Sequence, residues 1–410
     1  MKKYNLEVIV FICGAVVMVL EITGSRVLAP FLGTSLFVWT SLIGIILGSL
    51  SLGYWLGGRL ADKKTSYKIF SFIIFIAAIL IAITSFIKNG FLELIQTNIS
   101  DIRIGSIIAA TVLFAPASVF LGMISPYAVK LKLENLEKSG QTVGKLYALS
   151  TVGSIVGTFL AGFWLLAFLG NTKLLMILAI VLALTSLLAS GSNKKIKIIV
   201  ALLILGNFTT YSLKENKLAQ AGIIELDTDY NHVQIYKSRD PKTDQQVQTL
   251  DLGRASHSSM FLENDDLVFE YTKFYNLAKH FRPDLENSLI IGGGAYSYPK
   301  YYLKHFPEAD LDVVEIDPQL TELARKYFRL EENPRLNIYH EDGRTFLNKN
   351  TYKYDVIFGD AFHSFYSIPY QLTTVEAIQK MYDSLTDDGI VLVNIISSME
   401  GKTGKFLKAE

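Results

Sequence analysis

The 410-residue chain has a single cysteine, Cys13, which lies inside an apolar segment. One cysteine excludes a disulfide framework within the chain and any metal site built from several thiolates. Histidine is also scarce. The chain has six, and His280, His305 and His340 do not follow the spacing of a metal-binding cluster. We therefore expect no metal site.

Acidic residues are scarce only in the first half. Residues 1–213 carry 17 Lys and Arg against 7 Asp and Glu, a net charge of +10, whereas residues 214–410 carry 22 and 31, a net charge of −9. A basic half suits anionic lipid headgroups, and an acidic half attracts cationic ligands rather than nucleic acid. We predict two domains of opposite character and no nucleic-acid partner.

The first half consists of long apolar runs. They lie near residues 6–29, 37–57, 69–87, 105–126, 146–168, 174–191 and 197–213. Each is long enough, or nearly so, to cross a bilayer, so we predict a membrane domain of about seven transmembrane helices over residues 1–213. The first run contains Glu21 and Arg26 and no small-residue cleavage site, which indicates a retained span rather than a signal peptide.

Small residues at four-residue spacing indicate close helix packing within this domain. The glycine pairs are Gly44/Gly48, Gly53/Gly57 and Gly153/Gly157.

Basic residues fall on alternate connections between these runs. They cluster near residues 2–3, 59–68, 130–145 and 194–197, which predicts a cytoplasmic N-terminus in a multi-pass protein of the cell (inner) membrane. Seven spans would then place residue 214 onward outside, where nucleoside cofactors are scarce. If the short last run lies in the membrane interface or re-enters, the second half stays inside. Both arrangements are open, and cofactor availability favours the cytoplasmic side.

Two stretches of the first half resemble major facilitator transporters. GGRLADKK (Gly57–Lys64) is similar to the loop between their second and third helices, and the stretch Gly144–Gly162 is similar to their fifth helix. Seven spans make about half of such a transporter, so transport would require a homodimer. A scaffold or substrate-access role is the stronger interpretation.

The second half is organised around residues 289–317, LIIGGGAYSYPKYYLKHFPEADLDVVEID. The apolar run 289–291, the glycine turn, a helix-length segment and the apolar run 311–316 predict a βαβ unit. Further apolar strands are expected at 336–342, 354–361 and 389–396. Continuous apolar strands separated by helices predict a Rossmann-like α/β domain with a doubly covered parallel sheet.

Polar residues collect where these strands end. Gly292, Gly293 and Gly294 follow the first strand, Glu315 ends the second, and Asp342 and Asp360 follow the third and fourth. Ligands of parallel sheets bind beyond the carboxyl ends of the strands, and glycines there admit close backbone approach. Because the GxGxxG pattern is missing, we predict a pocket for a single nucleoside rather than a dinucleotide.

The segment before this sheet is β-like and turn-rich. Residues 223–262 predict a small antiparallel hairpin, and residues 265–281 carry apolar residues at helical spacing with Asp265 placed to cap a helix. We therefore divide the second half into a β-hairpin subdomain, 214–262, and a Rossmann-like domain, 263–410. The chain ends soon after the fifth strand, so we expect this domain to be truncated at its C-terminus.

Residues 223–396 resemble the spermidine synthase (aminopropyltransferase) family, whose domain has the fold of S-adenosylmethionine methyltransferases. DYNHVQIY, QVQTLDLG and DDLVFEY carry the resemblance before the glycine turn, and HEDG and the strand-four aspartate carry it afterwards. With membrane helices ahead, the arrangement is similar to the membrane-fused spermidine synthases of bacteria.

This resemblance implies roles for particular residues. Glu315 would hold the cofactor ribose, and Asp342 with Gly343 would meet the adenine. Asn231, at the position of the family's opening glutamine, would join Gly292–Gly294 in binding the cofactor. Asp360 would take the proton from the attacking amine, which is the only catalytic role that we assign.

The sequence also departs from the family pattern. Ala295 replaces an aspartate that contacts the donor's amino group, His363 replaces the second carboxylate after strand four, and Phe269 replaces the tyrosine at the helix start. Aromatic residues could supply a substitute cage for a cation. The candidates for contact with the substrate are His257, Tyr296, His363 and Tyr366, with Tyr298 and Tyr370 as further members of such a cage.

The leading hypothesis is a membrane-anchored polyamine aminopropyltransferase that uses decarboxylated S-adenosylmethionine and putrescine or a similar amine. A second hypothesis is a methyltransferase that uses S-adenosylmethionine on an amine or lipid-linked substrate, which the loss of the aspartate at Ala295 favours. A third is a non-catalytic half-transporter with a nucleoside- or polyamine-sensing domain, against which Asp360 argues because binding alone needs no base.

Overall fold

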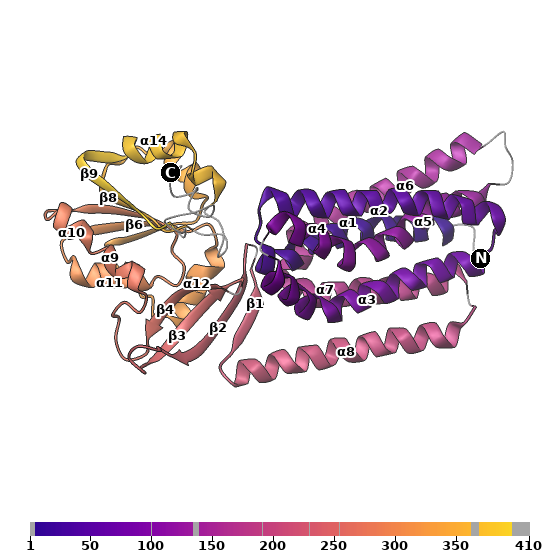
Figure 1. Ribbon diagram of the computed structural model, residues 1–410, viewed down its shortest axis with the longest axis horizontal. Helices are drawn as coiled ribbons and strands as arrows, with labels where there is room; N and C mark the ends of the chain where they lie inside the picture. The colour runs from indigo at the N-terminus through magenta and orange to yellow at the C-terminus, as the bar shows by residue number, and fades with distance from the viewer. Residues whose placement is uncertain are drawn as a thin grey trace. The chain divides into compact units, whose positions relative to one another are not determined.

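The structure is a computed structural model, and its chain divides into two compact units, Met1–Lys217 and Leu218–Glu410 (Figure 1). It describes residues 5–99, 101–133, 139–190, 192–228, 230–253, 255–361 and 369–395. The boundary between the units lies four residues after the predicted one and falls inside the helix Lys194–Gln220.

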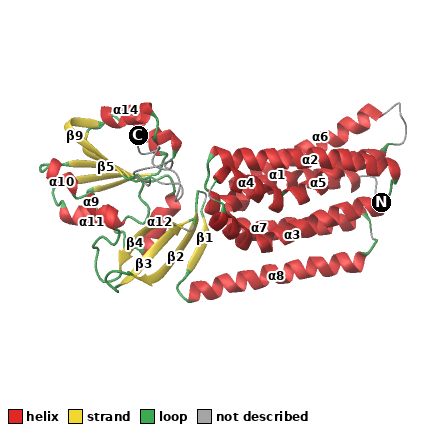
Figure 2. Ribbon diagram, in the orientation of Figure 1, coloured by secondary structure: helices red, strands yellow, loops and turns green. Residues whose placement is uncertain are grey.

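The described part of the first unit is helical throughout (Figure 2). Its elements are α1 (Asn5–Leu32), α2 (Leu36–Lys63), α3 (Tyr67–Asn98), α4 (Ile102–Leu113), α5 (Ala115–Lys132), α6 (Ser139–Leu160), the π-helix η2 (Ala161–Leu165), α7 (Leu166–Ala189) and α8 (Lys194–Gln220). Six of the helices are long and apolar enough to cross a membrane, and a seventh span results if the bent pair α4–α5 counts as one.

The fourth predicted span differs from the others because it is broken. The axes of α4 and α5 meet at 53°, and the break falls at Phe114, just before Pro116 in the first turn of α5. Proline lacks the N–H that would continue the hydrogen-bond ladder of α4, so a new helix begins there.

Glycines let neighbouring helices of this unit approach closely. A Cβ atom on Gly53 would lie 2.2 Å from the carbonyl oxygen of Val119, and one on Gly153 would lie 2.1 Å from that of Phe11. Close packing is thus confirmed for α2 against α5 and for α1 against α6. The pair Gly44/Gly48 has no such role, because a Cβ there would meet nothing within 4 Å.

Helix α8 runs antiparallel beside α7. Near its start, Lys197 donates to the carbonyl oxygens of Ser186 (3.3 Å) and Ser190 (3.2 Å) of α7 and its C-cap. Near its end, Glu215 pairs with Lys173 of α7 at 2.5 Å. These anchors are roughly 27 Å apart along α8 at 1.5 Å per residue, close to the thickness of a bilayer core. The length of α8 therefore fits a full crossing, and the crossing of this segment stays a prediction.

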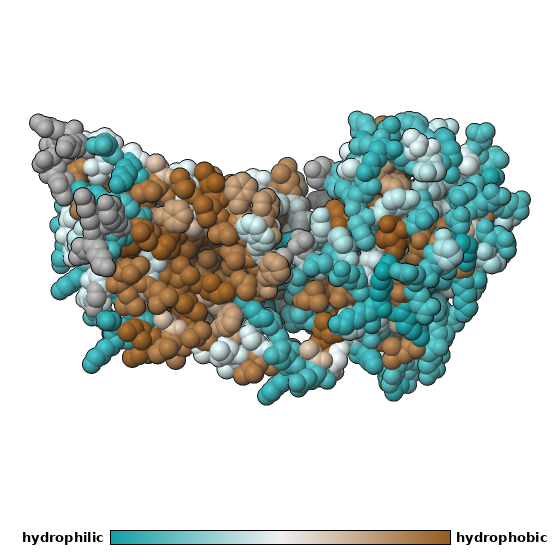
Figure 3. Space-filling model, turned by 180° about the vertical axis from the view of Figure 1, so that it is seen from behind, coloured by the Kyte–Doolittle hydropathy of each residue, from teal (hydrophilic) through white to brown (hydrophobic). Residues whose placement is uncertain are grey.

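The outer surface of the first unit is apolar, as the brown region in Figure 3 shows. Large exposed side chains on its helices include Trp55, Phe72, Phe159, Phe163, Trp164 and Leu202. An exposed apolar surface of this kind is what lipid contact requires.

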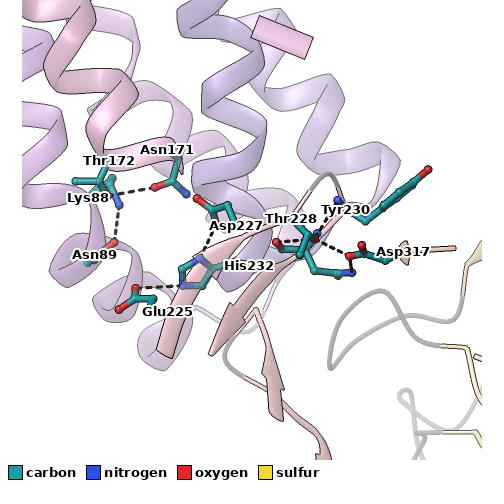
Figure 4. A network of polar contacts seen from close by, with 11 residues as sticks. Lys88, Asn89, Asn171, Thr172, Glu225, Asp227, Thr228, Tyr230, His232 and Asp317 are labelled. Carbon is teal, nitrogen blue, oxygen red and sulfur yellow. Dashed lines mark hydrogen bonds and ion pairs between the residues drawn. The ribbon is translucent and has the colours of Figure 1, made fainter. Parts of the chain in front are cut away.

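The second unit begins with a four-stranded antiparallel sheet rather than the single predicted hairpin. Its strands are β1 (Ile224–Asp227), β2 (His232–Arg239), β3 (Gln246–Leu252) and β4 (Ala255–Phe261), in the order β1-β2-β3-β4. His232 on β2 contacts Asp227 at 2.6 Å and Glu225 at 3.3 Å (Figure 4). Burial alone would lower the pKa of His232, but hydrogen bonds and charge from these two carboxylates raise it to about 9.

The second sheet of this unit is parallel, as predicted. Its order is β7-β6-β5-β8-β9, with β5 (Asn287–Ile291), β6 (Asp310–Val314), β7 (Leu336–Tyr339), β8 (Tyr354–Gly359) and β9 (Leu385–Val393). One face packs against α9 (Glu270–Phe274), α10 (Leu277–Phe281), α11 (Ser297–His305) and α12 (Pro318–Tyr327), and the other against α13 (Gly343–Lys349) and α14 (Val375–Asp383). The short 3-10 helix η3 (Tyr370–Leu372) precedes α14. This is the doubly covered Rossmann-like sheet.

The predicted helix over 265–281 is wrong in its start and its continuity. It is divided into α9 and α10, and α9 begins at Glu270. Asp265 does not cap it, because its carboxylate pairs with Lys300 and Arg329, each at 3.0 Å. These two cations come from after the glycine turn, beyond the reach of a local sequence pattern.

Candidate active site

A cavity of about 310 Å³ lies at the carboxyl ends of the central parallel strands. Its walls include every residue that we predicted to bind the cofactor, together with Asp360 and His257. The predicted members are Asn231, His257, Gly292, Gly293, Gly294, Glu315, Asp342, Gly343 and Asp360. The topology therefore gathers residues that are up to 129 positions apart in the chain.

Two of the glycines are required by the shape of the loop. Gly292 has φ +106°, and a Cβ atom there would lie 2.5 Å from the carbonyl oxygen of Asp360. A Cβ on Gly293 would lie 2.7 Å from the ring of Tyr296. A side chain at either position would clash, so the loop that follows β5 depends on glycine.

Glu315, just beyond β6, holds this loop in place. Its Oε2 accepts the backbone N–H groups of Gly293 (2.9 Å) and Gly294 (3.0 Å), and its Oε1 accepts that of Asp317 (3.0 Å). The side chain is buried, and this loss of water raises the pKa of Glu315 although the three N–H groups lower it. Oε2 already accepts two N–H groups, whereas Oε1 accepts only one and keeps a lone pair with which it can accept a ligand hydroxyl.

Asp342 has a structural role in addition to its place on the cavity wall. It is the N-cap of α13, where its Oδ1 accepts the N–H of Thr345 at 2.9 Å. Its Oδ2 accepts the side-chain amide of Gln371 at 3.2 Å. A Cβ atom on the next residue, Gly343, would lie 2.6 Å from a methyl carbon of Ile291, so α13 approaches β5 closely at this wall.

Asn231 reaches the cavity from the antiparallel sheet. Its amide donates to Asp317 at 3.3 Å, and the same carboxylate accepts the hydroxyl of Thr228 at 2.5 Å (Figure 4). Asp317 is fully buried and also caps α12 by accepting the N–H of Gln319. It thereby fastens the β1–β2 turn to the parallel sheet, a role that the sequence did not indicate.

Asp360, after β8, is the carboxylate with the most altered acidity in the cavity. Burial raises its pKa from 3.8 to about 6, against hydrogen bonds from Asn394, Tyr275 and Tyr271 that lower it. Asn394 donates to Oδ1 at 3.0 Å, and Tyr271 donates to Oδ2 at 3.4 Å. A carboxylate with a pKa close to neutral pH is suited to accept a proton from a substrate.

Tyr271 and Asn394 line the cavity and were missed in the sequence. Asn394 directly follows β9, so the rule that polar residues at strand ends form the site would have found it if extended to the fifth strand. Tyr271 lies two residues after Phe269, the position at which the family pattern has its tyrosine. In the structure the Tyr271 hydroxyl, and not residue 269, donates a hydrogen bond to Asp360.

One predicted substrate contact lies away from the cavity, and two others fall outside the described residues. Tyr296 does not reach the cavity, because its side chain is fully buried in the core and its hydroxyl lies 2.7 Å from that of Thr321. His363 and Tyr366 are outside the described residues. Ala295 is buried, and its N–H donates to the Ser258 hydroxyl at 3.1 Å.

No group of three or more metal-ligating side chains occurs among the described residues.

Part of the second unit is similar to known proteins. Residues 269–402 match the spermine/spermidine synthase domain. A polyamine aminopropyltransferase of Vibrio vulnificus is 31% identical over 135 residues, which are 32% of this chain and 45% of that protein. A polyamine aminopropyltransferase of Streptococcus pneumoniae is 34% identical over 139 residues, which are 32% of this chain and 47% of that protein. The chain thus spans a little under half the length of these relatives.

Solved structures give a further likeness. A spermidine synthase from Thermotoga maritima is 24% identical, with a TM-score of 0.38 over 46% of this chain and 61% of that chain.

Proposed function

We propose that this chain, which carries a spermine/spermidine synthase domain behind a bundle of apolar helices, is a membrane-embedded polyamine aminopropyltransferase. Its donor would be decarboxylated S-adenosylmethionine and its acceptor putrescine or a similar amine. The observation that carries the proposal is Asp360. This carboxylate has a pKa of about 6 and lies on the wall of the cavity that the nucleoside-binding residues form.

The cavity residues fit the nucleoside part of such a donor. Glu315 Oε1 has a spare lone pair for a ribose hydroxyl, and Asp342 presents its carboxylate to the adenine amino group. Gly292–Gly294 leave room for the ligand to approach the backbone. The relatives named as polyamine aminopropyltransferases support this assignment.

The reaction is a displacement at the carbon next to the sulfonium. An alkylamine is mostly protonated at neutral pH and must lose a proton before its nitrogen can attack. Asp360 accepts that proton, the nitrogen forms a bond to carbon, and the carbon–sulfur bond breaks with its electron pair returning to sulfur. The products are the extended amine and the neutral thioether nucleoside. The protein supplies alignment and a base.

A methyltransferase is the second candidate, and Ala295 favours it. No carboxylate stands at this position to meet an amino group of the donor. The same cavity would then hold S-adenosylmethionine and transfer its methyl group to an amine or lipid-linked acceptor.

One experiment separates these candidates. Purified full-length protein is incubated with either sulfonium donor and putrescine, and the products are identified by mass spectrometry. Spermidine formed from the decarboxylated donor is the expected result. A methylated product from the carboxylated donor would contradict the proposal, and saturable binding of donor without turnover with either would favour a sensor.

The location follows from the same chemistry. Both substrates are cytoplasmic metabolites in this proposal, so we place the second unit on the cytoplasmic side of the membrane. Lys132 at the end of α5 pairs with Glu7 at the start of α1, so the bent pair α4–α5 crosses and the described helices make seven crossings. The N-terminus and the second unit then lie on opposite sides of the membrane, so a cytoplasmic second unit requires an external N-terminus. A cysteine introduced by Lys217→Cys should react from the cytoplasmic face, and one introduced by Lys64→Cys from the outer face. Reaction of Lys217→Cys from the outer face would contradict the placement.

A further inference from the structure

Tyr296 has a left-handed backbone although it is not a glycine. Its φ is +58° and its ψ is +27°, and it stands directly before the first residue of α11. Bulky residues rarely adopt this conformation, because the Cβ atom crowds the backbone there. Strained residues of this kind persist only where the surrounding contacts fix them, and they gather at functional sites. The contacts of Tyr296 therefore indicate what the strain maintains.

The ring of Tyr296 lies against the loop that follows β5, on the side away from the cavity. The side chain is fully buried and is not part of the cavity wall, whereas Gly293 is. A Cβ atom on Gly293 would lie 2.7 Å from Cζ of the ring, so the ring occupies the space that a side chain at 293 would need. The carbonyl oxygen of Gly293 also accepts the N–H of Tyr296 at 2.8 Å. Gly293 is thus held between the cavity and this ring.

The far end of the ring is fixed to the next helix. The Tyr296 hydroxyl lies 2.7 Å from that of Thr321 on α12. Thr321 in turn lies 3.0 Å from Nε2 of His340, which follows β7. These three side chains therefore connect the segments that follow β5, β6 and β7. Thr321 is buried, so its contact with Tyr296 is shielded from water and holds the ring in one place.

Glu315 is the cavity side chain that depends most directly on this arrangement. Its Oε2 accepts the N–H groups of Gly293 and Gly294, while Oε1 accepts only that of Asp317 and keeps a lone pair for a ligand hydroxyl. A shift of Gly293 would move one of these donors and turn the carboxylate. Tyr296 prevents that shift without touching the ligand itself.

We propose that Tyr296 is a positioning residue, which holds Gly293 so that Glu315 presents Oε1 to a ribose hydroxyl and the cavity selects ribonucleosides over deoxynucleosides. The contact between the hydroxyls of Tyr296 and Thr321 is the anchor of this arrangement. The inference rests on the proposed function only for the nucleoside part of the ligand. It makes no use of the amine or of the group that is transferred.

The test compares two ligands by calorimetric binding to the full-length protein in detergent. They are methylthioadenosine and its 2′,3′-dideoxy counterpart, which differ only in the ribose hydroxyls. The wild type should bind methylthioadenosine at least about tenfold more tightly, because a hydrogen bond to a charged group is strong. In Tyr296→Ala this ratio should fall close to one, because the carboxylate is no longer held in one direction. A role of Tyr296 in packing alone would weaken both ligands equally and leave the ratio unchanged.

Tyr302→Ala is the matched control. Tyr302 is a second fully buried tyrosine, on α11 itself, and its hydroxyl donates to Ser288 at 2.8 Å. Neither of these two residues lies on the cavity wall. The variant removes the same atoms from the core as Tyr296→Ala does, and it should keep the wild-type ratio.

Two milder variants test the anchor, and they serve if Tyr296→Ala does not fold. Tyr296→Phe and Thr321→Val each remove one hydroxyl of the contact, and each should lower the ratio by about threefold. Because both changes act on one contact, the double variant should lower the ratio no further than either single variant. Additive losses would contradict the anchor at Thr321.

Two results would overturn the inference. One is a wild-type ratio near one, and the other is an unchanged ratio in folded Tyr296→Ala. Because binding is read without turnover, failure of the proposed enzyme activity is a separate result. An inactive protein whose ratio is high in the wild type and lost in Tyr296→Ala would refute the transferase and retain the role of Tyr296.

Discussion

Asn394 donates its side-chain amide to Oδ1 of Asp360 at 3.0 Å, joining the ends of the adjacent strands β9 and β8. The hydrogen bond fixes the direction of the carboxylate and stabilises its charged form. Burial works in the opposite sense and is the stronger effect, since the pKa of Asp360 is still raised to about 6. Asp360 is therefore positioned by β8, and part of its acidity is set by Asn394, which follows β9.

The first prediction concerns Asp360→Asn. The amide has the same shape but cannot accept the proton of an ammonium, so turnover should fall by about 10² to 10⁴. Methylthioadenosine affinity should be unchanged, because Glu315, Asp342 and the glycine loop are untouched. Turnover by mass spectrometry and binding by calorimetry measure the two effects. Wild-type turnover in this variant would remove Asp360 from the role of base.

The second prediction is a pH dependence. Asp360 acts in its charged form, which dominates above its pKa of about 6. The value of kcat/KM should therefore rise with pH through about 6 and level off above it on this acidic limb. If the acidic limb of kcat/KM were centred near pH 4 instead, which is the ordinary pKa of an aspartate, burial would not raise the pKa of Asp360.

Protonation of Asp360 also changes the stability of the folded protein, in a direction that its pKa fixes. The folded-state pKa of about 6 exceeds the unfolded value of 3.8, so the folded protein binds the proton more tightly and loses stability as the pH rises through this window. The variant Asp360→Asn has no such carboxyl group and does not lose this stability. The difference between its thermal midpoint and that of the wild type should therefore grow in favour of the variant from about pH 4 to pH 7. A difference that does not change with pH would contradict the raised pKa.

The third prediction concerns Asn394→Ala. Loss of a donor to the charged carboxylate should raise the pKa of Asp360 and move the acidic limb of kcat/KM upward by about 0.7 of a pH unit, if the hydrogen bond contributes about 1 kcal/mol. A role confined to packing would leave the limb in place. Asn337→Ala is the control, since Asn337 also donates its amide to an aspartate, Asp312, at 2.9 Å outside the cavity.

The fourth prediction compares two glycines with positive φ. Gly292→Ala combines strain at φ +106° with a Cβ atom 2.5 Å from the carbonyl oxygen of Asp360, and should abolish nucleoside binding and destabilise the second unit by about 3 kcal/mol or more. Gly222→Ala has φ +82° but nothing within 4 Å of its Cβ, so it should cost about 1 kcal/mol and leave binding intact. Thermal unfolding and calorimetry of both variants check this, and equal losses would refute the clash.

The fifth prediction tests whether α8 crosses the membrane. Its two ends are tied to α7 by Lys197 and Glu215, so the exposed residues Lys194 and Lys217 should lie on opposite sides of the bilayer. Single cysteines introduced by Lys194→Cys and Lys217→Cys, in a Cys13→Ala background, should react with impermeant reagents added to opposite faces. Reaction of both from one face would mean that α8 does not cross.

Periodic patterns in the sequence predicted the parallel sheet and most of the residues that line the cavity at its edge. Continuous apolar strands and polar strand ends depend on local chemistry, and they correctly gathered Gly292, Glu315, Asp342 and Asp360 around one cavity. The apolar runs likewise coincide with helices of the first unit, although the fourth run is broken at Phe114 and the sixth extends past the end of α7 at Ala189.

The features that were missed depend on partners far along the chain. Tyr296 was predicted to contact the substrate, but it is buried in the core, where its hydroxyl contacts that of Thr321. Asp265 was expected to cap a helix, but Lys300 and Arg329 engage it. Tyr271 meets Asp360 across 89 positions of sequence. Each outcome depends on a contact that no short window of sequence contains.

Gly292 is the glycine that looks most like a nucleoside-binding signature, yet a Cβ atom there would clash with the backbone of Asp360, just after the adjoining strand β8. The requirement for glycine therefore comes from the spacing of two strand ends, whether or not a nucleoside is present. A descendant of this fold that had stopped binding nucleosides would still need the same residue. The glycine turn is therefore evidence for the fold, and evidence for the ligand has to come from Glu315, Asp342 and Asp360.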